Sequence, residues 1–135
     1  MSLIEKAVKE FELKMESDEQ IKGTITTYYE TENGFSGLAG VPNGNPTPIR
    51  GILAHTNKSL MFYGEIFNKI PISLHIPFRE IKEIKKGKQI FAIFKTSPTI
   101  VVIHNDRETF STRGNKDEFT KLEAFFKNIN EIQPN

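Results

Sequence analysis

Apolar side chains near the start of the chain follow the period of an amphipathic helix. They recur at intervals of four, three and four residues and therefore share one helical face. Ser2 and Glu5 have the spacing of a capping box, in which each side chain accepts a hydrogen bond from the backbone N–H of the other residue. We predict a helix that ends near Glu16 and packs on its own domain, because its polar face mixes both charges, unlike that of a membrane-surface helix. The apolar positions are Ile4, Val8, Phe11 and Met15.

From Ile21 onward the pattern changes to alternation at every second residue, which is typical of β-strands with one buried face. The alternation is clearest over residues 70–78. Because Pro71 and Pro77 have no N–H to donate, we predict that this strand lies at a sheet edge or bends. The predicted strands comprise residues 21–29, 49–55, 59–64, 70–78, 89–94 and 99–104, an extended segment over 81–88, and a last short strand within 107–113.

Glycine and proline mark the connections between these strands. Residues 33–48 hold four of the nine glycines and three of the seven prolines, so we predict a long loop there. Its apolar side chains, Phe35, Leu38 and Val41, either dock onto a partner or fold back on the domain. Shorter turns are predicted at Gly87 and at Ser97–Pro98.

A second amphipathic helix is predicted at the end of the chain. Asn115 is its cap, Glu118 takes the reciprocal capping position, and Phe119, Leu122, Phe126 and Ile129 line one face. Seven short antiparallel strands bury their inner faces only as a sandwich or a closed barrel. We therefore predict a mainly β (α+β) fold, in which the C-terminal helix closes a seven-stranded barrel or sandwich. The first helix, within residues 1–19, packs on the domain formed by residues 20–135.

Composition and charge set limits without naming a function. Hydrophobic residues make up 37% and charged residues 26% of the 135 residues, which is typical of one globular domain. No apolar run reaches the roughly 20 residues that span a bilayer, and the charged start is unlike a secretion signal, so we expect a cytoplasmic protein. Cysteine is absent, which excludes disulfides and thiolate chemistry. The net charge is +1, divided as −4 up to Asn33 and +5 after it.

Two short segments resemble bacterial pleckstrin-homology-like and GRAM-like domains, and the YokE-like subgroup with its leading helix is the nearest match. The first segment is a strand and turn with Gly51, Leu53, Thr56 and Asn57; the second contains Ile76, Pro77, Phe78 and Ile81. The chain departs from the usual pattern at Ser59, where these domains have Arg, and in its longer glycine-rich loop. The resemblance covers roughly residues 21–129. It implies a partly open seven-stranded barrel closed by the C-terminal helix, and it implies no activity.

Three kinds of site are not expected. Relatives that bind inositol phosphates place cations in the loop after the first strand, whereas residues 30–48 contain no Lys or Arg, so we expect neither specific phosphoinositide binding nor a phosphate cradle. His55, His75 and His104 lie on three different predicted strands without ligand spacing, which argues against a metal site. No nucleophile elbow or paired acid and base is present. We therefore predict a non-enzyme without a cofactor.

The densest basic cluster comprises Lys82, Lys85, Lys86 and Lys88. Alternation places Lys82, Lys86 and Lys88 on one face. The cluster is either the solvated part of a strand and turn or an anion-binding surface for weak association with anionic membranes. Glu80 and Glu83 dilute its positive potential. Nucleic-acid binding is not expected, because the nearby aromatic residues fall in apolar runs typical of a core.

Residues 90–94 and 99–103 are apolar at both parities, so part of their outer face needs cover. Either the leading helix or a neighbouring subunit could supply that cover. The predicted interaction surface comprises Phe91, Ile93, Val102, Ile4, Val8 and Phe11. We therefore predict a module for protein–protein contact or self-association; the alternative is peripheral binding to anionic lipid through residues 82–88.

Overall fold

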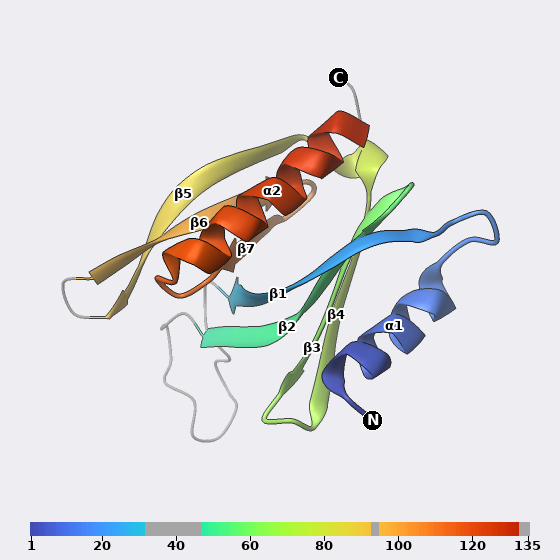
Figure 1. Cartoon of the computed structure of the whole chain (residues 1–135), viewed down its shortest axis with the longest axis horizontal. Coiled ribbons are helices and arrows are strands. Elements are labelled where there is room, and N and C mark those ends of the chain that lie inside the picture. Colours follow the sequence, from blue (N-terminus) through green and yellow to red (C-terminus); the bar gives the residue numbers. More distant parts are fainter. Residues whose placement is uncertain (32–46, 93–94, 133–135) are drawn as a thin grey trace.

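A computed structural model describes residues 1–31, 47–92 and 95–132, and the side chains of residues 1–30, 48–88 and 97–129. Over these described residues the chain forms a helix, seven strands and a second helix, with one short 3₁₀ turn (Figure 1). In order, the elements are α1 (Leu3–Lys14), β1 (Ile21–Thr31), β2 (Thr47–Thr56), β3 (Ser59–Ile66), β4 (Ile70–Pro77), η1 (Phe78–Glu80), β5 (Glu83–Ala92), β6 (Lys95–Ile103), β7 (Arg107–Ser111) and α2 (Lys116–Ile132).

The strands form one antiparallel sheet that curls into a half-barrel (Figure 1). Their order is β4-β3-β2-β1-β7-β6-β5, so β4 and β5 are the two edges. The mainly β (α+β) fold predicted from the alternation is confirmed, and it is consistent with the pleckstrin-homology-like barrel that the resemblance implies. The edge position predicted for residues 70–78 is also confirmed, and it explains why the sheet tolerates Pro71 and Pro77.

The concave inner face of the sheet and one face of α2 form the main core. Phe62 and Phe110 are fully buried, and their ring centroids lie 5.9 Å apart. The Phe126 ring of α2 packs against the Phe110 ring in a tilted arrangement, with the centroids 6.0 Å apart. The Asn115 side chain accepts a hydrogen bond from the Glu118 N–H at 3.0 Å and so caps the helix. The predicted apolar face is confirmed, because Phe119, Leu122, Phe126 and Ile129 all lie in this core.

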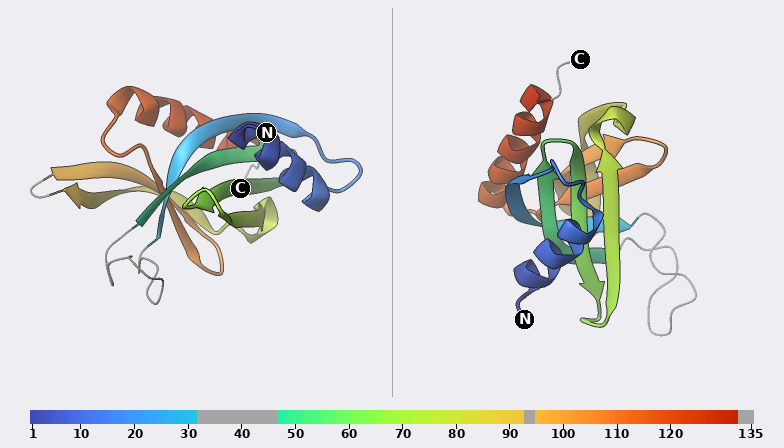
Figure 2. Two further views of the ribbon diagram at one scale, coloured as in Figure 1. Left: turned by 90° about the horizontal axis from the view of Figure 1, so that it is seen from below. Right: turned by 90° about the vertical axis from the view of Figure 1, so that its right-hand side faces the viewer.

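α1 packs on the outer face of β2 and β3 and forms a second, smaller core. Figure 2 shows α1 lying across these strands, apart from β5. Its buried side chains are Ala7 and Phe11, with Leu3 and Met15 packed beside them. The predicted face was partly wrong, because Ile4 is 44% exposed and Val8 is only half-buried. The fully buried Ala7 lets the helix axis lie close to the sheet, which turns the larger Ile4 toward the flank.

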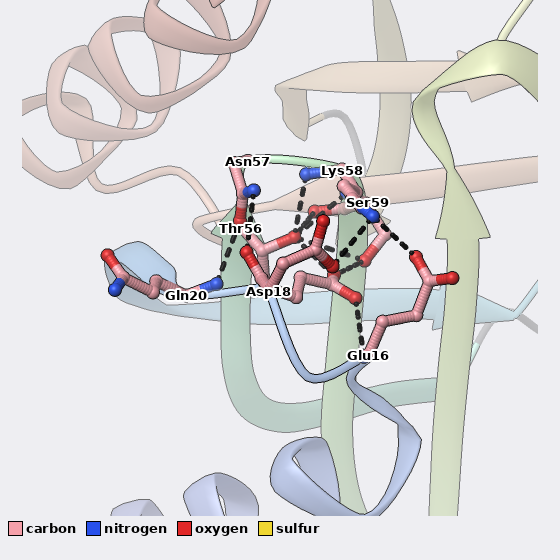
Figure 3. Close-up of polar contacts among 8 residues, drawn as sticks. Glu16, Asp18, Gln20, Thr56, Asn57, Lys58 and Ser59 are labelled. Atoms are coloured by element: carbon pink, nitrogen blue, oxygen red, sulfur yellow. Dashed lines mark hydrogen bonds and ion pairs between the residues drawn. The ribbon is translucent and has the colours of Figure 1, made fainter.

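A buried carboxylate fixes the link between α1 and β1 to the β2–β3 turn (Figure 3). The Glu19 carboxylate, 7% exposed, accepts hydrogen bonds from the hydroxyls of Thr56 and Ser59. The Thr56 hydroxyl in turn accepts from the N–H groups of Lys58 at 3.0 Å and Ser59 at 2.9 Å. Ser59, where resembling domains have Arg, is thus a buried hydroxyl partner of Glu19.

Asn57 and Lys58 hold the same link from its solvent side (Figure 3). The Asn57 side chain accepts from the Gln20 N–H at 2.8 Å and donates to the Asp18 carbonyl at 3.2 Å. The Lys58 ammonium group pairs with Asp18 at 2.8 Å and with Glu16 at 3.0 Å. The Thr-Asn pair of the motif therefore has a structural role: it joins the first helix to the sheet.

The turns predicted at Gly87 and at Ser97–Pro98 are wrong, because these residues lie within strands β5 and β6. Gly87 pairs with Thr99, and Pro98 pairs with Lys88, within one continuous ladder. A Cβ at Gly87 would lie 2.9 Å from the Thr99 hydroxyl oxygen, so this glycine permits a close cross-strand approach. Pro98 lies one residue beyond the last β6–β7 pair, Thr99 with Ser111, and its missing N–H leaves that ladder intact.

Candidate functional site

The residues of the predicted interaction surface do not form one exposed patch. Val102 and Phe11 are 0% and 1% exposed, because the first lies in the main core and the second points from α1 into the smaller core against β2 and β3. Phe91 and Ile93 lie outside the residues whose side chains the structure describes. α1 packs on β2 and β3. Which surface covers residues 90–94, the leading helix or a neighbouring subunit, stays a prediction, because the side chains of these residues lie outside the described part of the structure.

The lysine cluster lies along the edge strand β5 and just before it. Lys82 precedes the strand, and its N–H donates to the Ile103 carbonyl at 2.7 Å. Lys86 and Lys88 share a face of β5, and Lys85 lies on the other. All four lysines are exposed. The Lys86 ammonium group forms an ion pair with Glu123 of α2 at 2.5 Å, so its charge is already neutralised.

An apolar groove of about 390 Å³ lies between β5 and α2. Ile84, Ile100 and Phe126 contribute its apolar lining. The latter two are nearly fully buried, and Ile84 is half-buried. On the helix side the lining includes the short side chains of Thr120 and Ala124, both exposed. Figure 1 shows α2 running alongside β5 and β6. The groove lies where this helix faces the edge strand.

The charges around this groove are mainly positive. Lys85 and Lys127 line it and form no ion pair among the described residues. Glu123 also lines it, but Lys86 neutralises that carboxylate. The groove therefore combines apolar lining with uncompensated positive charge, a combination that suits an apolar ligand carrying acidic groups.

A second cavity, of about 440 Å³, is polar and lies where β1 and β2 meet the connection from β7 to α2. Its lining includes Arg50, Arg113 and Glu118. Arg113 donates to both carboxylate oxygens of the buried Glu30, at 3.1 and 3.0 Å, and Ser111 donates to the same carboxylate at 2.7 Å. The bidentate pair neutralises Arg113. Arg50 is therefore the one uncompensated cation among the described lining residues, too few for a phosphate cluster.

The three histidines lie in different places and do not converge. His55 is buried against the Phe125 ring at 4.9 Å, and its Nδ1 atom makes no hydrogen bond among the described residues. Burial lowers the pKa of His55, and the Thr56 backbone offsets this only in part. His104 contacts Glu108 at 2.9 Å, and His75 lies on β4. Over the described residues, no three His, Asp or Glu side chains are placed to hold a metal ion.

The helical side of the groove was not predicted from the sequence. Thr120, Glu123, Ala124 and Lys127 were not identified, because only their proximity to β5 distinguishes them from other exposed helix positions. The one signal in the sequence is Ala124, a small residue two positions before Phe126 of the predicted apolar face, and this signal is too weak to indicate a site. Neither described helix is long and apolar enough to cross a membrane.

Comparisons with known proteins identify the fold. A family model described as GRAM domain matches residues 5–131. The hSac2 domain from human phosphoinositide phosphatase Sac2 is structurally similar, with a TM-score of 0.61 and 11% sequence identity over 97% of this chain and 80% of that chain. The C-terminal domain of an unknown protein from Leishmania infantum gives a TM-score of 0.49 at 14% identity, over 91% and 94% of the two chains. No curated protein matches the sequence.

Proposed function

Because the chain belongs to the GRAM domain family, whose pleckstrin-homology-like fold generally serves binding rather than catalysis, we propose that it is a non-catalytic module that binds another protein in the groove between β5 and α2. The observation that carries the proposal is this groove, an open apolar surface beside an edge strand. Exposed apolar surfaces rimmed by polar residues mark sites of interaction with proteins, membranes or ligands. Thr120 and Ala124 line the helix side of this groove.

Protein binding fits the groove better than membrane binding does. A membrane surface attracts cations that lie together on one face with their charge available. Here the Lys86 charge is neutralised by Glu123, and Glu83 lies two residues before Lys85. The apolar lining lies between a strand and a helix, where a side chain can enter and a bilayer cannot.

Site-specific photo-crosslinking tests the proposal. The photoreactive p-benzoylphenylalanine would replace Ala124 in the full-length chain, and Lys121, an exposed position of α2 outside the groove lining, would be the matched control. We expect a discrete protein adduct from position 124 that is absent from position 121. Isothermal titration of that purified partner should then show binding about tenfold or more weaker for Ala124→Trp, and unchanged for Lys121→Trp.

Two outcomes would overturn the proposal. The first is equal crosslinking from both positions, because contact would then not depend on the groove. The second is sedimentation of the chain with anionic vesicles, unaffected by Ala124→Trp, together with no adduct at position 124. That result would instead support lipid binding through Lys85 and its neighbours.

A further inference from the structure

Resting on the proposed function, we infer that the groove takes an extended segment of a partner protein, which pairs with the outer edge of β5 and alternates apolar with acidic side chains. The partner would add an eighth strand to the sheet. Its backbone would bind β5, and the side of the segment that faces α2 would fill the groove. Acidic side chains on its opposite side would meet Lys85, which lies on the other face of β5 from Ile84.

The first support comes from the two edges of the sheet. β5 pairs with β6 alone in the described part of the chain, so a row of its N–H and C=O groups points away from the sheet. The ten residues of β5 contain no proline that would remove a donor. The other edge, β4, contains Pro71 and Pro77 and is therefore a poorer template for a new strand.

The second support is the shape of the groove. Ile84 packs against the core, so side chains with its parity on β5 point to the inner face. A strand added beside β5 would point every second side chain the same way, toward Ala124 and Phe126 of α2. A helix in the same place could fill the apolar volume, but it could not pair with the donors and acceptors of β5. The volume of about 390 Å³ suits a few apolar side chains.

The third support is charge, which also decides between a partner and a second copy of this chain. Lys85, Lys88 and Lys127 are exposed and form no ion pair among the described residues. Two β5 edges pairing with each other would bring lysines of one copy against lysines of the other, and like charges across strands are destabilising. Edge lysines commonly prevent such self-pairing. The same lysines attract an acidic strand, so the partner is a different, acidic segment.

The test is an unbiased selection of peptides with the full-length chain. A random nonapeptide display library would be selected on the wild-type protein and depleted on Ala124→Trp. We expect a consensus that alternates apolar residues with Asp or Glu and avoids central proline. Lys85→Glu should weaken binding of the synthetic consensus peptide about tenfold or more, whereas Lys9→Glu, an exposed lysine on α1, should leave it unchanged.

Backbone methylation separates strand addition from other modes. N-methylation of alternate amides facing β5 should reduce affinity at least about tenfold, and methylation of the amides facing away should not. Selected peptides with apolar residues at helical spacing, or binding that is insensitive to methylation, would overturn the inference and leave the proposed function in place. Selection of no groove-dependent peptide, despite a protein adduct at position 124, would also overturn the inference alone. Absence of both would overturn the proposed function with it.

Discussion

Replacing Glu19 with alanine should destabilise the fold far more than replacing the neighbouring Asp18. The Glu19 carboxylate is 7% exposed and accepts hydrogen bonds from the Ser59 hydroxyl at 2.6 Å, from the Thr56 hydroxyl, and from the Glu16 N–H at 3.1 Å. The Asp18 carboxylate pairs with Lys58 at 2.8 Å, but its side chain is 68% exposed. Exposed ion pairs add little stability because water screens them.

The expected loss follows from the hydroxyls that Glu19→Ala leaves behind. Hydrogen bonds to a charged group contribute about 1.5–3 kcal/mol each, so the two hydroxyls set a range of about 3–6 kcal/mol. The Thr56 and Ser59 hydroxyl oxygens lie 3.3 Å apart and can turn toward each other, which offsets part of the loss. We therefore expect the lower end of the range, about 3 kcal/mol in the free energy of unfolding.

Urea unfolding followed by circular dichroism measures this difference. With a denaturant dependence of about 2 kcal/mol per molar, the midpoint for Glu19→Ala should fall by about 1.5 M at pH 7, and the midpoint for Asp18→Ala should change much less. Burial raises the pKa of Glu19, but its hydrogen bonds to Ser59 and Thr56 together outweigh burial and lower the pKa below 4.5. The stability from Glu19 is therefore present above pH 4.5 and is lost as the pH falls through the lowered value. Equal midpoints for the two variants would refute this account of the link.

Two further predictions concern the β3–β4 turn and the main core. Phe67 and Asn68 have φ angles of 54° and 58°, a left-handed turn that favours Asn and Gly, so the double variant Phe67→Asn, Asn68→Gly should raise the thermal midpoint by a few degrees; a lower midpoint in calorimetry would contradict this. Burial lowers the pKa of His55 below 6.5, so the unfolded chain is protonated first, and stability should decline as the pH falls from 6.5 toward the lowered value. Between pH 7 and pH 5.5 the urea midpoint should therefore fall less for His55→Leu than for the wild-type protein. An equal fall in both proteins would exclude a contribution from His55.

Local periodicity was sufficient for the parts of the fold that depend on one element at a time. The face of α2 could be predicted because Phe119, Leu122 and Phe126 are large, share one side and have a cap before them. The edge position of β4 could be predicted because proline lacks the donor that an inner strand uses on both sides. These signals lie within the segment itself, so the rest of the chain is not needed to interpret them.

Prediction failed where the answer depends on the opposing surface. The buried face of α1 includes Ala7, which a count of large apolar residues overlooks. Ala7 is buried in the same cluster as the large side chains Met61 and Tyr63 of β3, and only the folded sheet places them there. The sequence pattern predicts a turn at Gly87, whereas this residue lies mid-strand opposite the Thr99 hydroxyl. In both cases a small residue lies close to another element of the fold, and the local sequence pattern does not identify that element.

The candidate site shows the same division between local and distant information. The lysines near β5 could be identified from the sequence, but their available charge could not, because Glu123 lies 37 positions after Lys86 and becomes its partner only when α2 crosses the sheet. The groove itself exists only through that crossing.

The family motif and the proposed binding site occupy different parts of the molecule, and this separates what family membership predicts from what it does not. Thr56 and Asn57 of the motif hold α1 and the start of β1 against the β2–β3 turn, so their role is structural. The groove depends instead on Lys85, Ala124 and Lys127, which lie outside the motif. A chain can therefore keep every motif residue and bind a different ligand, since substitutions along β5 and α2 leave the α1 attachment intact. Ligand specificity in this protein should accordingly follow from the β5–α2 groove.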